Sequence, residues 1–286
     1  MSARRGAQVF FVMGAPKSGT TWVQAIYNAH PQVSCLGEGH FVEFLAQPMS
    51  ELLETYRKKL ALVDERVYLG SAPYRPFSSA ESLTWIRQMI GRMMQRAGAN
   101  PDALWWGDKT PAYCRQIGAL NQLFPLARFI HVVRDPRDVT VSALHHAKRA
   151  GVLVNTSDSG PLRQELVNNS IERWRHSIGA VSEWRERLGE RLMEVQYRKL
   201  IDDPAEGIGR LFRHLEGIDV TEALIAQAAA RTSFEAMSGG RKQGQVNDQS
   251  FFRAGTYGRY TDELTEHEIQ LIEERLEPAM RDYGFA

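Results

Sequence analysis

The chain has 286 residues, of which 43% are hydrophobic, and it is long enough to bury the core of an α/β domain. Its 35 basic and 34 acidic residues give a formal net charge of +1, so nothing indicates a nucleic-acid binder. The two cysteines, Cys35 and Cys114, exclude a disulfide framework and lack metal-ligand spacing, and we expect a reducing compartment and no metal. The N-terminus shows no signal-peptide core, and no apolar run approaches the ~20 residues that span a bilayer.

Strand and helix patterns alternate along the chain. The apolar runs predict strands over 8–13, 33–36, 104–107, 128–133 and 192–197. Helical periodicity and capping signals predict helices over 20–28, 49–62, 79–97, 111–124, 136–149, 163–188, 204–216, 221–230 and 265–281. Glycine-rich polar segments at 151–162 and 238–260 are predicted to lack helix and strand. No repeat or linker divides the chain, so residues 1–286 are predicted to form a single α/β domain with a P-loop-like central parallel sheet flanked by helices.

The motif Gly14-Ala-Pro-Lys-Ser-Gly-Thr-Thr-Trp22 joins the first strand to the first helix. Free amides at the helix N-terminus, the helix dipole, the Lys17 ammonium and nearby hydroxyls meet there, which favours a phosphate or a similar oxyanion. Gly14 and Gly19 have Walker A spacing, but Thr20 follows Gly19 where that motif has its lysine, and Lys17 lies two residues earlier. The alternative interpretation is an ordinary glycine turn between strand and helix.

A second candidate site follows the strand at 128–133. Arg134 ends this strand, and Ser142 lies about two turns into the next helix. The planar guanidinium of arginine binds phosphate through two parallel hydrogen bonds. The alternative is a surface salt bridge from Arg134 to Asp135 or Asp138.

These motifs resemble those of sulfotransferases that use 3′-phosphoadenosine 5′-phosphosulfate (PAPS). The run P-K-S-G-T-T-W looks like the 5′-phosphosulfate loop of that family. Arg134 and Ser142 match the family's 3′-phosphate pair in residue type and spacing. For the phosphosulfate loop, the resemblance implies cofactor contacts at Lys17, Ser18, Gly19, Thr20, Thr21 and Trp22.

The run Ser250-Phe-Phe-Arg-Ala-Gly-Thr-Tyr-Gly-Arg-Tyr260 resembles the family's C-terminal R-K-G-x-x-G-x-W loop, which closes over the 3′-phosphate. Arg253 and Gly255 match it. Ala254 replaces the usual lysine, so one charge contact is lost while a backbone amide remains. Tyr260 replaces the tryptophan.

Adenine contacts are implied by weaker matches. The run Arg231-Thr-Ser-Phe-Glu-Ala-Met237 is similar to the family's T-S-F-x-x-M segment, which points to Thr232 and Phe234. Tyr197, at the end of a predicted strand, and Trp22, in the first helix, fall where the family has further contacts with the base.

The run Gly107-Asp-Lys-Thr-Pro-Ala-Tyr113 looks like the E-K-[ST]-P-x-Y element of heparan-type and many bacterial sulfotransferases, and it includes Lys109. The run from Ala29 to Glu38, A-H-P-Q-V-S-C-L-G-E, resembles the tyrosylprotein sulfotransferase sequence A-H-P-x-V-x-C-x-E-E. The resemblance implies that Glu38 is the catalytic base. His40 is the next candidate and Glu43 the third. The alternatives are that Glu38 is a solvated turn carboxylate and that Lys109 pairs with Asp108.

The resemblance implies transfer of a sulfuryl group from PAPS to a hydroxyl acceptor by in-line attack, with adenosine 3′,5′-bisphosphate (PAP) as product. Lys17 and Lys109 would neutralise charge on the leaving group, without a metal ion. We expect a small-molecule or glycan acceptor, with lipid, sugar, phenol, alcohol and peptide tyrosine all open. Segments 39–78, 145–165 and 238–252 would form its walls, with aromatic side chains from Tyr68, Tyr74 and Phe77.

The resemblance also bears on location and on rival functions. Golgi sulfotransferases carry a membrane anchor, and this sequence shows no apolar run of that length, so we expect a cytoplasmic relative. No motif specifies an oligomeric state. One rival is a P-loop small-molecule kinase, for which Asp108 is the only fair Walker B carboxylate. The other is a non-catalytic protein that binds PAPS or PAP.

Overall fold

The computed structural model describes residues 8–98, 100, 102–156 and 160–285. Five strands form one parallel sheet in the order β2-β3-β1-β4-β5. Their bounds are β1 Gln8–Gly14, β2 Val33–Gly37, β3 Trp105–Lys109, β4 Arg128–Val133 and β5 Leu192–Gln196. Every predicted strand is present, and the predicted central parallel sheet is confirmed.

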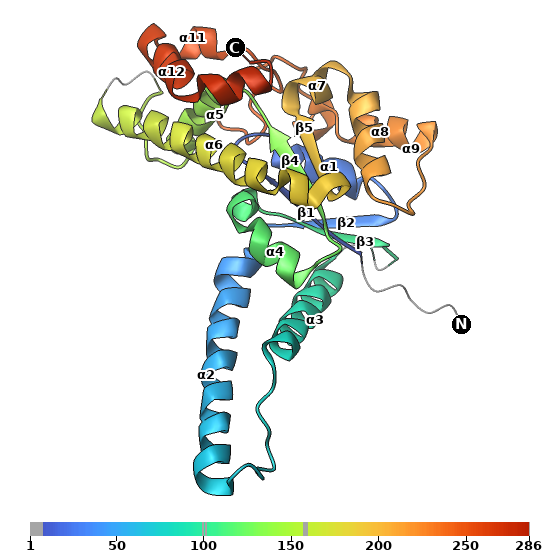
Figure 1. The fold of residues 1–286 in the computed structure, drawn as a ribbon. Coiled ribbons are helices and arrows are strands. Elements are labelled where there is room, and N and C mark those ends of the chain that lie inside the picture. The colour runs from blue at the N-terminus through green and yellow to red at the C-terminus, as the bar shows by residue number, and fades with distance from the viewer. Residues whose placement is uncertain (1–7, 99, 101, 157–159, 286) are drawn as a thin grey trace.

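Helices lie on both sides of the sheet (Figure 1). The α-helices are α1 Thr20–Asn28, α2 Gln47–Val63, α3 Ser79–Ala97, α4 Ile117–Leu123, α5 Pro136–Arg149, α6 Pro161–Leu188, α7 Tyr197–Asp202, α8 Pro204–His214, α9 Glu222–Arg231, α10 Phe234–Met237, α11 Tyr260–Glu263 and α12 Glu266–Asp282. Tighter and wider turns add η1 Phe41–Ala46, η2 Asp64–Tyr68, η3 Pro111–Gln116 and η4 Gly189–Arg191.

Several predicted boundaries differ from the structure by a few residues, and for two of them the structure gives a local reason. The segment predicted as one helix over 111–124 begins as the 3₁₀ turn η3, in which the buried Tyr113 hydroxyl donates to Asp108 and holds the turn against β3. The strand predicted to end at 197 ends at Gln196, because Tyr197 is already the first residue of α7.

The strands are buried on both faces, as expected for a parallel sheet covered by helices. Along β1, Phe11 and Met13 face one core, which includes Ile86 and Ile90 of α3. Phe10 and Val12 alternate with them and face the opposite core against α1 and α8. Because these strands pair in parallel, the carboxyl ends of β1, β2, β3 and β4 lie at one edge of the sheet.

Helices α2 and α3 project away from the sheet as a long arm between β2 and β3 (Figure 1). The predicted capping box is present at the start of α3, where Ser78 and Glu81 exchange side-chain and backbone hydrogen bonds. In α3, four residues are buried, whereas α2 buries none. The arm is thus anchored through α3.

Candidate active site

The loop after β1 presents a helix N-terminus that lacks a side-chain cap. Gly19 occupies the N-cap position of α1 with φ of 100° and gives the first amides no side-chain acceptor. A Cβ at Gly19 would lie 2.4 Å from the ring of Tyr197, so only glycine fits beside that ring. Ser18 is buried, and its Oγ has no hydrogen-bond partner in the described part of the chain. Open amides and an unpartnered buried hydroxyl favour an anionic ligand here.

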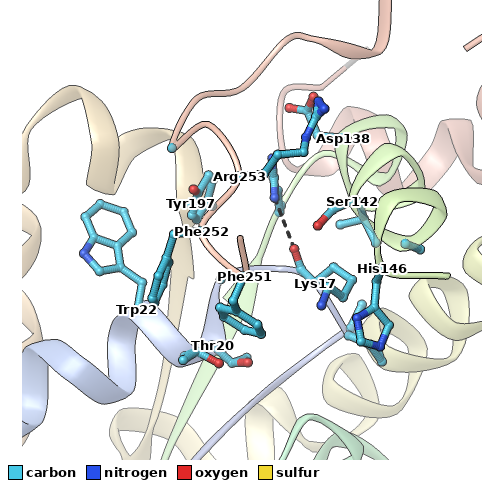
Figure 2. Close-up of a pocket in the computed structure, with 18 of the residues that line it drawn as sticks. Lys17, Thr20, Trp22, Asp138, Ser142, His146, Tyr197, Phe251, Phe252 and Arg253 are labelled. Carbon is cyan, nitrogen blue, oxygen red and sulfur yellow. Dashed lines mark hydrogen bonds between the residues drawn. The ribbon is translucent and has the colours of Figure 1, made fainter. Parts of the chain in front are cut away.

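A cavity of about 860 Å³ opens over this loop (Figure 2). Most of the predicted site residues line it. They are Lys17, Gly19, Thr20, Thr21, Trp22, Glu38, His40, Arg134, Ser142, Tyr197, Thr232, Phe234, Arg253, Ala254 and Gly255. Among the predicted catalytic and cofactor-binding residues, three do not line it: Ser18 is buried in the loop, Lys109 is buried beside Glu38, and Glu43 contacts His40 outside the lining. The structure therefore gathers side chains from segments more than 200 residues apart around one cavity.

Glu38, Lys109 and His40 lie together where β2 and β3 end. Lys109 Nζ is 2.7 Å from Glu38 Oε1, and His40 Nε2 is 3.7 Å from Glu38 Oε2. His40 Nδ1 also contacts the carboxylate of Glu43. Partial burial raises the pKa of Glu38, but the hydrogen bond and charge of Lys109, together with His40, outweigh it and hold this pKa below its usual value. The Glu38 carboxylate is therefore ionised at neutral pH.

The alternative partner proposed for Lys109 is occupied by other groups. The Asp108 carboxylate accepts hydrogen bonds from the hydroxyls of Thr110 and Tyr113 and from the amide of Gly39. Lys109 instead reaches Glu38 across the boundary between the two strands. Through its bond to the Gly39 amide, Asp108 thus holds the backbone next to Glu38 in place.

Strained backbone is concentrated at this cavity. Among the described non-glycine residues, positive φ occurs at Lys17 (75°), Glu38 (53°), His40 (45°) and Leu69 (49°). The first three line the cavity. Such conformations cost of order 1 kcal/mol or more each, and they cluster at functional sites in proteins. Three chemically active side chains held in this way mark the cavity as the candidate active site.

Lys17 lies in an environment that disfavours its positive charge. Burial and the nearby cations Arg149, Arg134 and Lys109 lower the pKa of Lys17 to about 8, against the opposing effect of Glu38. Its ammonium is 5.0 Å from the ring centroid of Phe251. An anion in the cavity would relieve this crowding of cations.

Arg134 is held by backbone carbonyls and an aromatic ring. Its guanidinium donates to the carbonyls of Lys17 and Thr256, each at 3.2 Å, and lies 4.5 Å from the centroid of Tyr197. No salt bridge joins it to Asp135 or Asp138 in the part of the chain that the structure describes, so that alternative is wrong. Asp135 pairs with Arg137, and Asp138 accepts from the Gly258 amide. Ser142 faces the same cavity from α5 (Figure 2).

Arg253 lines the cavity, but its guanidinium is engaged by other side chains. It contacts the Glu263 carboxylate, and its Nη1 lies 2.8 Å from His145 Nε2 and 3.7 Å from Asp248 Oδ1. These contacts arise because the segment 238–259 folds back onto α5 and α11. Ala254 is buried beside it, and Gly255 has φ of 65° with the ring of Phe234 directly against its Cα.

Aromatic side chains gather at one end of the cavity. The Trp22 indole donates to the Thr232 carbonyl at 2.8 Å, and its ring meets Tyr197 edge to face at 5.6 Å. Phe251 and Phe252 lie between Trp22 and Lys17 (Figure 2). The sequence analysis included these two phenylalanines in the predicted acceptor wall 238–252 but assigned neither of them an individual role.

The predicted acceptor walls are only partly correct. His40 comes from the first predicted segment, and residues of the other two also line the cavity. Tyr68, Tyr74 and Phe77 do not line it, because their segment belongs to the projecting arm. Helical periodicity could not reveal that α2 points away from the site.

Comparison with known proteins gives the following likenesses. The model of the sulfotransferase family matches residues 9–222. A protein-tyrosine sulfotransferase of Drosophila melanogaster is 26% identical over 216 residues, which cover 75% of this chain and 39% of that protein. The omega-hydroxy-beta-dihydromenaquinone-9 sulfotransferase Stf3 of Mycobacterium bovis is 34% identical over 112 residues, 37% of this chain and 27% of that protein. The chain thus spans less than half of the length of these two relatives.

Solved structures show the same fold. Mouse sulfotransferase SULT7A1, complexed with PAP, superposes with a TM-score of 0.57 at 15% identity, over 97% of this chain and 86% of that one. Retinol dehydratase in complex with androsterone and PAP gives a TM-score of 0.55 at 18% identity, over 96% and 81%. Among the described residues, no helix combines the length and apolar character needed to cross a membrane. Since the family model covers most of the chain, this protein belongs to the sulfotransferase family.

Proposed function

We propose that this protein transfers a sulfuryl group from PAPS to a hydroxyl acceptor. The observation that carries the proposal is the convergence of Lys17 and Glu38, both with strained backbone, on a cavity beside an uncapped helix N-terminus. Family membership and the PAP named in two structural neighbours support the choice of nucleotide. Helix dipole and open amides suit the 5′-phosphosulfate.

The cavity offers a place for each part of the nucleotide. The loop with Ser18 and Gly19 would hold the phosphosulfate, and the Trp22 end would hold adenine. Arg134 and Ser142 would bind the 3′-phosphate. The Nε of Arg134 is buried without a hydrogen-bond partner among the described residues, so this donor is open to a phosphate while the two terminal nitrogens bond the carbonyls of Lys17 and Thr256. A charge-assisted bond to phosphate is the stronger interaction.

The proposed transfer would form one bond to sulfur and break another. The acceptor oxygen attacks sulfur in line as the bond from sulfur to the bridging oxygen breaks, and Glu38 takes the hydroxyl proton. Lys17, which lines the cavity, would stabilise the charge that develops on the departing bisphosphate, an interaction that strengthens in the transition state, whereas Lys109 is buried against Glu38 and would act on the base. The ion pair between Lys109 and Glu38, 2.7 Å long, holds the base ionised and directed before the acceptor binds.

The first test is calorimetric titration with PAP, using ATP with magnesium as a competitor. We expect selective PAP binding, weakened about 10- to 100-fold in Arg134→Ala, as for loss of a hydrogen bond between charged groups. Tight ATP binding without a response to PAP would instead support a kinase.

The second test measures transfer from labelled PAPS to a panel of phenols, alcohols, sugars and tyrosine peptides. Glu38→Gln should lower turnover about 10²- to 10⁴-fold, the usual effect of losing a general base, with unchanged PAP affinity. Glu43→Gln is the matched control, because Glu43 reaches Glu38 only through His40. Equal losses in the two variants would contradict Glu38 as the base. Binding of PAP without transfer to any acceptor would support the non-catalytic alternative.

A further inference from the structure

A cluster of charged side chains ties Arg253 to helices α5 and α11. Both oxygens of the Glu263 carboxylate contact the Arg253 guanidinium, and Arg259 Nε lies 3.2 Å from Glu263 Oε1. The buried His145 of α5 faces two carboxylates, with Nε2 2.5 Å from Glu263 Oε2 and Nδ1 3.2 Å from Asp248 Oδ1. We call these five residues the latch.

The latch gives one nitrogen of His145 two neighbours with opposite requirements. His145 Nε2 is 2.8 Å from Arg253 Nη1, and an arginine nitrogen only donates, so this contact requires a lone pair on Nε2. The Glu263 oxygen at 2.5 Å instead requires a proton there. Burial raises the pKa of Glu263, but its bonds to His145 and Arg253 outweigh burial and keep this carboxylate ionised. Because Nε2 cannot meet both requirements at once, Arg253 and a protonated His145 are alternative partners of one carboxylate oxygen.

The other groups around His145 suit a ring that is protonated on both nitrogens. His145 Nδ1 and Asp248 Oδ1 are buried, and neither has a hydrogen-bond partner among the described residues. A proton on each nitrogen would let the ring donate to Asp248 and to Glu263. The neighbouring cations contact the carboxylates: Lys148 Nζ is 4.0 Å from Asp248 Oδ2, and Arg163 of α6 donates to the Glu263 carbonyl. Arg253 is thus the cation in direct contact with the ring in the described part of the chain.

The latch lies beside the proposed position of the 3′-phosphate. His145 is three residues after Ser142 on α5, which is about one turn, and Arg253 lines the cavity together with Ser142 and Arg134. A phosphate there would compete for the Arg253 guanidinium, because arginine binds phosphate through strong, charge-assisted hydrogen bonds. Withdrawal of Arg253 would leave the Glu263 carboxylate, which is only 19% exposed, short of a cation. Breaking one side of such a pair is costly unless another cation takes its place.

We propose that His145 is a positioning residue for Arg253, which takes up a proton and replaces Arg253 on Glu263 when the 3′-phosphate of PAP draws Arg253 away. The inference rests on the proposed function, because PAP is its ligand. The proton comes from solvent and resides on Nε2, and only hydrogen bonds are exchanged. PAP binding is then coupled to the charge of a side chain that does not touch the nucleotide.

Calorimetry in buffers of different ionisation enthalpy measures the protons taken up with each PAP. At pH 7.5 we expect the native protein to take up as much as about one proton more per PAP than His145→Gln does, by linkage between binding and protonation. Lys17 and the phosphates exchange protons in both proteins, so the difference isolates His145. His176→Gln is the matched control, since His176 is exposed on α6, and it should behave as the native protein does. Circular dichroism verifies that each variant is folded.

Two further controls separate this coupling from a general effect on stability. Adenosine 5′-phosphate lacks the 3′-phosphate, so at saturation it should bind without the His145-dependent proton. In Glu263→Gln, the additional change His145→Gln should alter proton uptake no further, because a neutral amide needs no replacement cation.

Three outcomes would overturn the proposal. The first is equal proton uptake by the native protein and folded His145→Gln when both bind PAP. The second is an equal His145-dependent uptake with adenosine 5′-phosphate. The third is a chain that binds no PAP, which would overturn the proposed function as well and is thereby distinguished from the first two.

Nuclear magnetic resonance of isotopically labelled histidine follows the proton directly. The ring resonances that are missing from His145→Gln belong to His145. At a pH where these resonances report a neutral ring in the free protein, added PAP should move both nitrogens to the positions of an imidazolium. A His145 ring whose charge does not respond to bound PAP at any pH would assign it a purely structural role and overturn the proposal.

Discussion

At the scale of single residues, the site contains side chains at positions whose left-handed backbone conformation favours glycine. Lys17, Glu38 and His40 all have positive φ. The loops that follow β1 and β2 could be recognised in the sequence, because each motif directly follows an apolar run. The left-handed conformations could not, because they depend on contacts across the sheet, such as that between Glu38 and Lys109.

Replacement of Lys17 tests this strain directly. Lys17→Gly and Lys17→Ala remove the same ammonium, but only glycine adopts φ of 75° freely. We expect the free energy of unfolding, measured with urea, to be about 1 kcal/mol higher for Lys17→Gly than for Lys17→Ala. PAP binding should be impaired in both variants. Equal stability of the pair would show that the loop relaxes and holds no strain.

Lys17 should also confer a pH dependence on nucleotide binding. Its pKa of about 8 means that it is charged below pH 8 and neutral above it. PAP affinity should therefore fall between pH 7 and pH 9 by about tenfold, the worth of one charge-assisted hydrogen bond. Titration calorimetry at both pH values measures this. Lys17→Arg, which stays charged, should show a flatter profile, and an equally flat profile in the native protein would contradict the assignment.

The lowered pKa of Lys17 also makes the free energy of unfolding depend on pH. An unfolded lysine keeps its ordinary pKa of about 10.5, so between pH 8 and pH 10.5 the unfolded chain binds more protons than the folded one. Stability from this residue therefore rises with pH across that window. Urea unfolding of the native protein and Lys17→Met over this range would show it as a difference in slope.

At the scale of elements, the segment 238–259 behaves as one unit held by Arg241. Its guanidinium donates to the carbonyls of Gln245, Arg253 and Phe252 and to the Ser250 hydroxyl. The glycine-rich composition correctly predicted the lack of helix and strand. It could not predict this internal cross-linking or the engagement of Arg253 by Glu263, because both join residues that no local pattern relates.

Arg241→Ala should loosen this segment without unfolding the sheet. We expect faster proteolytic cleavage within 238–259 and weaker PAP binding, since the segment carries Arg253, Ala254 and Gly255 into the cavity. Limited proteolysis followed by mass spectrometry locates the cuts. Lys242→Ala removes an exposed neighbour whose side chain makes no hydrogen bond among the described residues, and it should cleave as the native chain does. Added PAP should slow proteolytic cleavage of this segment in both variants.

At the scale of the whole molecule, the sheet and the projecting arm formed by α2 and α3 are structurally distinct parts. The parallel, P-loop-like sheet could be anticipated from the alternation of strand and helix, whereas the order β2-β3-β1-β4-β5 could not. The projection of α2 could not, because its apolar residues have the period of an ordinary packed helix. Only the burial pattern shows that the described part of the chain leaves every residue of α2 at least partly exposed.

Shortening the arm tests this separation. Joining Tyr56 to Phe77 through a short glycine linker removes the far half, because these rings already lie 6.3 Å apart. We expect the shortened chain to have a PAP affinity equal to that of the native protein by calorimetry, since the deleted segment contributes no cavity residue. A loss of PAP binding in a folded variant would show that the arm supports the site.

The strained residues also bear on how stable this fold could become. A protein that drifts toward stability gains most readily where a side chain opposes the backbone, and glycine at 17, 38 or 40 would relieve such opposition. All three positions instead carry a charged or titratable group that faces one cavity. Each such glycine would therefore raise the free energy of unfolding while removing a group that faces the cavity.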